Sequence, residues 1–163
     1  MSDDKNDYKK VHRAGTIPYI IENGEIQMMF MVPSNPLYGG SLMTVIKEDG
    51  SANEELVALP QLAKGKIEEG ETAREAALRE AKEEIGLFIG NVELVEELGL
   101  FMGRTTVFVA KVKDKDMFGA PGEETGDVHW MTLEQFMSDG RQLHVPVIQA
   151  AHRLICKIEG MKP

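Results

Sequence analysis

The sequence has little of several features that define particular protein classes. It carries one cysteine, Cys156, in 163 residues, which excludes an internal disulfide framework, and we expect this thiol to be packed in a core. No apolar run approaches the roughly 18 residues of a membrane span, and the polar N-terminus lacks the apolar segment of a secretion signal. We therefore expect a cytoplasmic protein with no membrane partner.

Positive charge is also scarce. The chain has 18 Lys and Arg against 27 Asp and Glu, which gives a formal net charge of -9. Non-specific binding to a nucleic-acid backbone needs a basic face, so we do not expect a nucleic-acid partner. If the chain acts on phosphates, a bound divalent metal is the obvious source of the missing positive charge.

Length and patterning indicate one α/β domain. The chain is long enough to bury a single core, and strands alternate with helices, which favours a mixed sheet. We expect a polar tail over residues 1–10 and one domain over residues 11–163.

Turn signals place the strands. Asn23-Gly24 between two apolar runs predicts a hairpin, and Thr105–Val112 reads as a later strand. After a Pro- and Gly-rich loop, apolar runs at residues 42–46 and 56–59 flank a polar stretch and predict a second hairpin.

Three helices are predicted from their end signals. The first begins at Thr72 with a capping box and stops at Gly86, a residue that tolerates the left-handed conformation. The second opens at Thr132 with a similar box. The third runs from about Pro146 to Ile158, since proline is favoured in a first helical turn.

The first helix carries three carboxylates on one face. Glu80, Glu83 and Glu84 stand at i, i+3 and i+4, and Arg79 alone cannot balance them. Such a stripe is poor for stability and well suited to holding Mg²⁺ or Mn²⁺, which prefer hard oxygen ligands. A solvated acidic helix shows the same pattern, so the sequence of the loop before the helix is needed to distinguish a metal site from a solvated surface.

That loop completes a longer pattern. Gly65, five residues, Glu71, seven residues and then "REAKEEIGL" occupy every fixed position of the Nudix box. With each letter at roughly 7% of residues, seven fixed letters match by chance about once in 10⁸ windows. The chain resembles the Nudix hydrolases over about residues 11–158, and it departs from them in a segment around 33–55 that we interpret as a variable insertion.

The resemblance implies an α/β/α sandwich with a mixed sheet and a set of roles in the box. The implied metal ligands are Glu80, Glu83, Glu84 and the backbone carbonyl of Lys64, with Glu124 as a further candidate. Arg79 and Glu71 are expected to pair and fix the loop against the helix, while Gly65 and Gly86 serve structural roles. The implied cofactor is Mg²⁺, with Mn²⁺ as a substitute.

The general base and the substrate contacts are less defined. Glu80, Glu123 and Glu124 are candidates for the base, and we favour Glu124 as a loop residue. Arg13 and Arg104 are candidates for phosphate contacts. Tyr19, Phe30 and Tyr38 are candidates for stacking on a nucleobase, and Tyr38 is favoured because it lies in an irregular loop.

The implied reaction is hydrolysis of the pyrophosphate bond in a nucleoside diphosphate linked to another moiety. ADP-ribose, a dinucleoside polyphosphate and FAD are the leading substrates. No subtype marker follows the box, so the sequence does not choose among them. Two alternatives stay open: a nucleoside triphosphate pyrophosphatase that removes damaged nucleotides, and a nucleotide-binding module without turnover. A homodimer is also open, with the 33–55 segment as a candidate interface.

Overall fold

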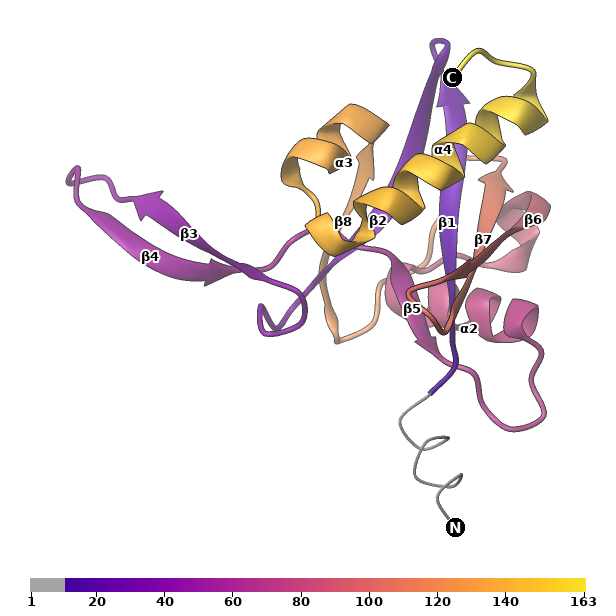
Figure 1. Cartoon of the computed structure of the whole chain (residues 1–163), viewed down its shortest axis with the longest axis horizontal. Coiled ribbons are helices and arrows are strands. Elements are labelled where there is room, and N and C mark those ends of the chain that lie inside the picture. Colours follow the sequence, from indigo (N-terminus) through magenta and orange to yellow (C-terminus); the bar gives the residue numbers. More distant parts are fainter. Residues whose placement is uncertain (1–10) are drawn as a thin grey trace.

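The computed structural model describes residues 11–163, so the tail predicted for residues 1–10 lies outside the described part (Figure 1). Within that part, six strands form one mixed sheet in the order β6-β7-β1-β2-β8, with β5 also paired to β1. These strands are β1 (Arg13–Glu22), β2 (Glu25–Pro33), β5 (Ala63–Lys66), β6 (Val92–Phe101), β7 (Thr105–Val112) and β8 (Thr125–Met131). The predicted mixed sheet is confirmed.

Helices cover both faces of this sheet (Figure 1). The structure has α2 (Ala73–Ile85) on one face, α3 (Leu133–Asp139) and α4 (Val145–Glu159) on the other, and short 3₁₀ turns η1 (Ile89–Asn91) and η2 (Gln142–His144). The predicted capping boxes open α2 at Thr72 and α3 at Thr132, and Gly86 ends α2 with a φ of 74°. The predicted sandwich is therefore confirmed. None of the helices within residues 11–163 combines the length and apolar character that a bilayer crossing requires.

The turn between β1 and β2 is the one predicted from Asn23-Gly24. Both residues have positive φ, 52° and 78°, and Glu22 pairs with Glu25 across the turn. These are the backbone conformations that a two-residue type I′ hairpin requires.

The central strand β1 changes partner along one edge. Residues 13–16 pair with β5 and residues 19–22 pair with β2, both antiparallel, while β7 runs parallel along the other edge. β5 and β2 therefore lie end to end beside β1, joined by a bridge in which Met31 and Gln61 exchange two backbone hydrogen bonds. A sheet that splits in this way leaves room beside the bridge for a pocket.

Two apolar cores fill the layers on either side of the sheet. Tyr19 and Phe30 are fully buried in the layer under α4, where Phe30 packs on Phe136 with ring centroids 4.3 Å apart. The stacking on a nucleobase that the sequence left open for Tyr19 and Phe30 is therefore wrong, because neither ring reaches solvent. Cys156 is 2% exposed in the same core, as predicted.

The strands β3 (Ser41–Ile46) and β4 (Ala52–Val57) pair only with each other and project from the domain in Figure 1; we call this hairpin the arm. The second hairpin is confirmed, but its second strand begins at Ala52 and not in the apolar run at 56–59. The turn at residues 47–51 sets a register in which Ile46 faces Ala52, so polar residues are drawn into the strand. Leu42 and Ile46 on the arm are 68% and 75% exposed.

Candidate active site

Small residues bring α2 close to the sheet. The side chains that face the sheet have no exposed surface and belong to Ala76, Ala77 and Ala81. Because the helix repeats every 3.6 residues, Glu80, Glu83 and Glu84 then share the neighbouring edge of the helix. This edge faces β5 and the loop that precedes α2.

Arg79 ties that loop to the helix. Its guanidinium donates to both carboxylate oxygens of Glu71, at 2.8 and 3.0 Å, and to the Lys66 carbonyl at 3.0 Å. The remaining nitrogen, Nη1, lies 2.8 Å from Glu80 and 3.4 Å from Glu83. The hydrogen bonds from Arg79 lower the pKa of Glu71 below its ordinary value. The paired Glu71 and Arg79 that the box implied are thus in contact.

Glu84 lies against β5 and is in an unusual electrostatic state. Its carboxylate accepts the backbone N–H of Lys64 at 3.0 Å. Burial, followed by the charge of Glu80, raises the pKa of Glu84 to about 8. Burial also raises the pKa of Glu80, in spite of the opposing contact with Arg79. Two adjacent carboxyls with raised pKa values favour the uptake of a proton or a cation.

β5 turns its free edge towards these carboxylates. The Lys64 N–H reaches Glu84 and the Lys66 carbonyl reaches Arg79, so both residues direct their backbone groups away from β1. A strand residue sends its N–H and C=O to the same side. The Lys64 carbonyl therefore opens towards α2, on the side where the box implies a backbone ligand.

Both structural glycines of the box permit a close approach. A Cβ at Gly65 would overlap the Glu80 carboxylate, so glycine lets Glu80 lie directly on the backbone of β5. A Cβ at Gly86 would overlap the backbone of Gly119, whose N–H donates to the Gly86 carbonyl at 2.8 Å. A side chain at Gly86 would therefore meet backbone, whereas a side chain at Gly65 would displace the Glu80 carboxylate.

A pocket of about 540 Å³ opens where β2 and β5 separate. It is lined by Arg13, Met31, Pro33, Tyr38, Gln61, Leu62, Lys64, Lys66, Glu84 and Glu124. Four candidates from the sequence meet here with the Lys64 backbone, namely Arg13, Tyr38, Glu84 and Glu124. Glu80 and Glu83 do not line this pocket, and Arg104 lines the neighbouring one.

The loop before β8 carries Glu124 to the pocket. The Glu124 carbonyl accepts the Ser34 N–H at 2.9 Å, and the next residue, Thr125, donates its hydroxyl to the Glu84 carbonyl at 2.6 Å. These bonds hold the loop against the end of α2, and the charge of Glu124 contributes to the raised pKa of Glu84. Glu123, the other loop candidate for the base, does not line the pocket.

The sequence reasoning missed Gln61, which lines the pocket, and Arg141, which contacts Gln61. Gln61 donates to the Tyr38 carbonyl at 2.8 Å and accepts from Arg141 at 3.1 Å. Arg141 arrives from the segment between α3 and η2, far along the chain. No spacing in the sequence links these positions, because only the tertiary fold brings them together.

The carboxylates do not converge on one point. Within residues 11–163, no three His, Cys, Asp or Glu side chains are gathered closely enough to hold a metal ion. The reason is local: Arg79 holds the Glu80 and Glu83 side chains, while Glu84 is turned to the Lys64 N–H. The donors are nevertheless hard oxygens, which suit Mg²⁺ and Mn²⁺.

The chain matches a known family over most of its length. A family profile described as NUDIX domain matches residues 39–151, which is more than half of the chain. The chain belongs to the Nudix family. The Nudix match starts inside the segment around 33–55 that we expected to be variable, and the sheet also contains β1 and β2, which precede the match.

Solved structures share this Nudix fold at low sequence identity. A C. elegans Ap4A hydrolase, described as a binary complex, superposes with a TM-score of 0.64 at 18% identity, covering 93% of this chain and 99% of that one. The Nudix hydrolase RenU from M. smegmatis superposes with a TM-score of 0.60 at 14% identity, covering 90% of this chain and 88% of that one. The NUDIX domain of Shewanella oneidensis NrtR, crystallised with ADP ribose, superposes with a TM-score of 0.60 at 13% identity, covering 90% of this chain and 88% of that one.

Proposed function

We propose that this Nudix protein hydrolyses the pyrophosphate bond of a nucleoside diphosphate linked to another moiety, with Mg²⁺ or Mn²⁺ as cofactor. The observation that carries the proposal is the state of Glu84. Its carboxyl lies beside the Lys64 backbone, at a pocket that Glu124 also lines, and its pKa is raised to about 8. Such a group costs stability unless a cation binds there, and perturbed carboxyls of this kind cluster at functional sites.

The metal would be held by Glu80, Glu83, Glu84, the Lys64 carbonyl and Glu124. These are the oxygen donors that face the edge between β5 and α2 or line the adjoining pocket. A divalent ion bound among them supplies positive charge opposite the pyrophosphate oxygens and a more acidic water.

The chain's own residues have distinct parts in this proposal. Glu124 takes the proton of the attacking water, because it lines the pocket and its loop is held against α2. Arg79 positions the helix and the loop and does not touch the substrate. Arg13 and Lys64 oppose the phosphate charge. The exposed ring of Tyr38, at the pocket rim, stacks on the nucleobase.

The substrate is best sought among nucleotides with two linked moieties. The solved structures with this fold include a hydrolase named for Ap4A and a domain crystallised with ADP ribose, which supports a nucleotide for this chain as well. ADP-ribose, dinucleoside polyphosphates and FAD are therefore the first substrates to test.

A screen of these nucleotides with Mg²⁺ and with Mn²⁺, with products identified by mass, tests the proposal. We expect cleavage at a pyrophosphate bond that yields a nucleoside monophosphate or a longer phosphorylated product. Release of pyrophosphate from nucleoside triphosphates alone would favour the sanitising enzyme. Binding of ADP-ribose without cleavage of any nucleotide would favour a binding module.

A further inference from the structure

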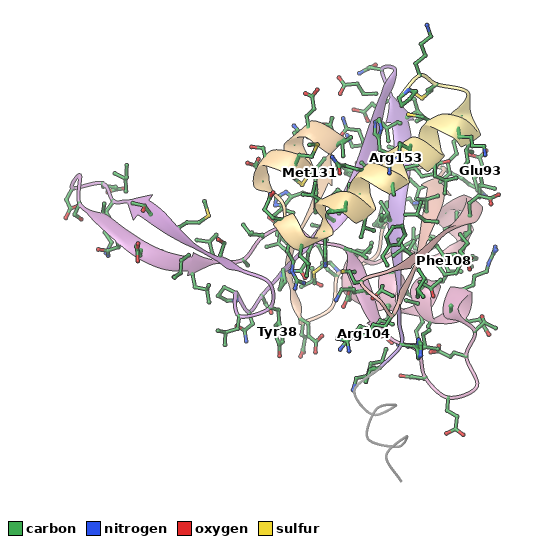
Figure 2. The ribbon with its side chains drawn as sticks, viewed as in Figure 1. Tyr38, Glu93, Arg104, Phe108, Met131 and Arg153 are labelled. Carbon is green, nitrogen blue, oxygen red and sulfur yellow. The ribbon has the colours of Figure 1, made fainter. Side chains whose placement is uncertain are left out.

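A second pocket, of about 410 Å³, adjoins the acidic one and shares Arg13 and Lys64 with it. Two further arginines, Arg104 and Arg141, line this second pocket. We call the group Arg13, Lys64, Arg104 and Arg141 the basic compartment. In Figure 2, Arg104 and Tyr38 both lie in the lower part of the view.

Four separate segments deliver these cations. Arg13 opens β1 and its N–H donates to the carbonyl of Arg104, which immediately precedes β7. Lys64 comes from β5, and Arg141 from the stretch between α3 and η2. The cluster is therefore a product of the fold and not of one basic run in the sequence.

The compartment concentrates positive charge in an acidic protein. The ion pairs found within residues 11–163 engage Arg79, Lys111, Lys115 and His129, and none of them engages Arg13, Lys64 or Arg141. Like charges that line one pocket repel one another, so the pocket favours a bound anion.

Arg141 is held in place without being neutralised. Its Nη1 donates to the amide oxygen of Gln61 at 3.1 Å, and its backbone N–H donates to the Pro60 carbonyl at 2.9 Å. A Cβ on Gly39 would lie 2.6 Å from Arg141 Nε, so the loop backbone packs directly on the guanidinium. Neutral acceptors orient the guanidinium and leave its charge available to a ligand.

We propose that the basic compartment binds the phosphate chain that extends beyond the scissile pyrophosphate, which makes a dinucleoside polyphosphate the preferred substrate. The inference rests on the proposed hydrolase function. ADP-ribose has two phosphates followed by an uncharged ribose, so it offers no further phosphate to Arg104 and Arg141. A longer phosphate bridge offers additional phosphates to these cations. The exposed side chains of Met102 and Leu143 at the same pocket give the second nucleoside an apolar surface.

Kinetics of Arg141→Gln test the assignment. Removing one charged hydrogen-bond donor should raise KM for diadenosine tetraphosphate by about tenfold, while KM for ADP-ribose changes less than about twofold. Arg104→Gln, on a different segment, should show the same split. Arg153→Gln is the matched control, because Arg153 is exposed on α4, away from Arg104 in Figure 2, and should change neither KM. Equal losses on both substrates would overturn the proposal.

A binding measurement separates this inference from the proposed function. With EDTA present to prevent turnover, inorganic tripolyphosphate should bind the wild-type protein and bind Arg141→Gln about tenfold more weakly. Absence of tripolyphosphate binding, or equal binding by both proteins, would overturn the compartment even if ADP-ribose is hydrolysed. A wild-type protein that cleaves no nucleotide with either metal would overturn the hydrolase function, whatever the outcome with tripolyphosphate.

Discussion

Replacing Glu84 by glutamine should destroy activity and, at the same time, make the metal-free protein more stable at alkaline pH. Glutamine has the same shape as the protonated carboxyl, and its amide oxygen can still accept the Lys64 N–H. The substitution therefore removes the negative charge and keeps the contact.

The magnitude follows from the raised pKa of Glu84, about 8 against an ordinary value of 4.5. Because the folded state holds the proton more tightly than the unfolded state, this group's contribution to stability is fully present below pH 4.5 and is lost as the pH rises to about 8. A full shift corresponds to about 5 kcal/mol at 1.36 kcal/mol per pKa unit, an upper limit. With solvent screening and relaxation, we expect Glu84→Gln to gain about 1–3 kcal/mol at pH 8.5 and almost nothing at pH 4.5.

Urea unfolding in EDTA at the two pH values measures this gain, and the nucleotide screen with Mg²⁺ measures the loss of activity. We expect the rate to fall by several orders of magnitude. Glu97→Gln, at an exposed position on β6, is the control and should shift stability by less than about 0.5 kcal/mol at either pH. A Glu84→Gln protein that is less stable at pH 8.5, or that keeps wild-type activity, would contradict the role assigned to the Glu84 charge.

Three further predictions concern other parts of the molecule. Gly65→Ala should leave the fold intact but abolish activity in the nucleotide screen, because the added Cβ displaces the Glu80 carboxylate. Gly90→Ala is the control, where the added Cβ meets only Phe88 at 3.5 Å, and it should change neither the fold nor the activity. His144 is buried, its Nδ1 accepts the Leu62 N–H at 3.1 Å, and burial lowers its pKa to about 3. In this pH range the unfolded chain binds a proton at His144 and the folded chain does not, so the free energy of unfolding should fall by about 1.4 kcal/mol per pH unit as the pH drops from 6.5 towards 3. Urea unfolding should show a flatter decline for His144→Asn. Replacing residues 42–56 of the arm by a short Gly-Ser loop should change the melting temperature by less than about 2 °C, because an unsupported hairpin adds little stability; a large drop would show that the arm is covered in solution, as in the homodimer that the sequence left open.

Local signals predicted the elements that frame the site. The capping boxes at Thr72 and Thr132, the stop at Gly86 and the turn at Asn23-Gly24 all act through neighbours a few residues away, so the sequence contains the whole cause. The acidic face of α2 was predictable for the same reason, since helical periodicity alone places its three glutamates together.

Properties that depend on tertiary contacts could not be predicted from the sequence. The start of β4 at Ala52 is set by its partner strand and not by its own hydrophobicity. The burial of Tyr19 and Phe30 depends on which face of the sheet α4 covers. The meeting of Gln61 with Arg141 joins segments 80 residues apart, and no local pattern encodes it. The sequence offered Arg13 and Arg104 as candidates for phosphate contacts, but only the fold brings them together with Lys64 and Arg141.

The most direct measurement is calorimetric titration of Mn²⁺ into the purified protein at pH 8.5, where most Glu84 carboxyls should be ionised, with and without a nucleotide. We expect saturable uptake by the wild-type protein and at least about tenfold weaker uptake by Glu84→Gln. Absence of Mn²⁺ uptake in both conditions, or equal uptake by the two proteins, would contradict the claim that these glutamates form a metal site.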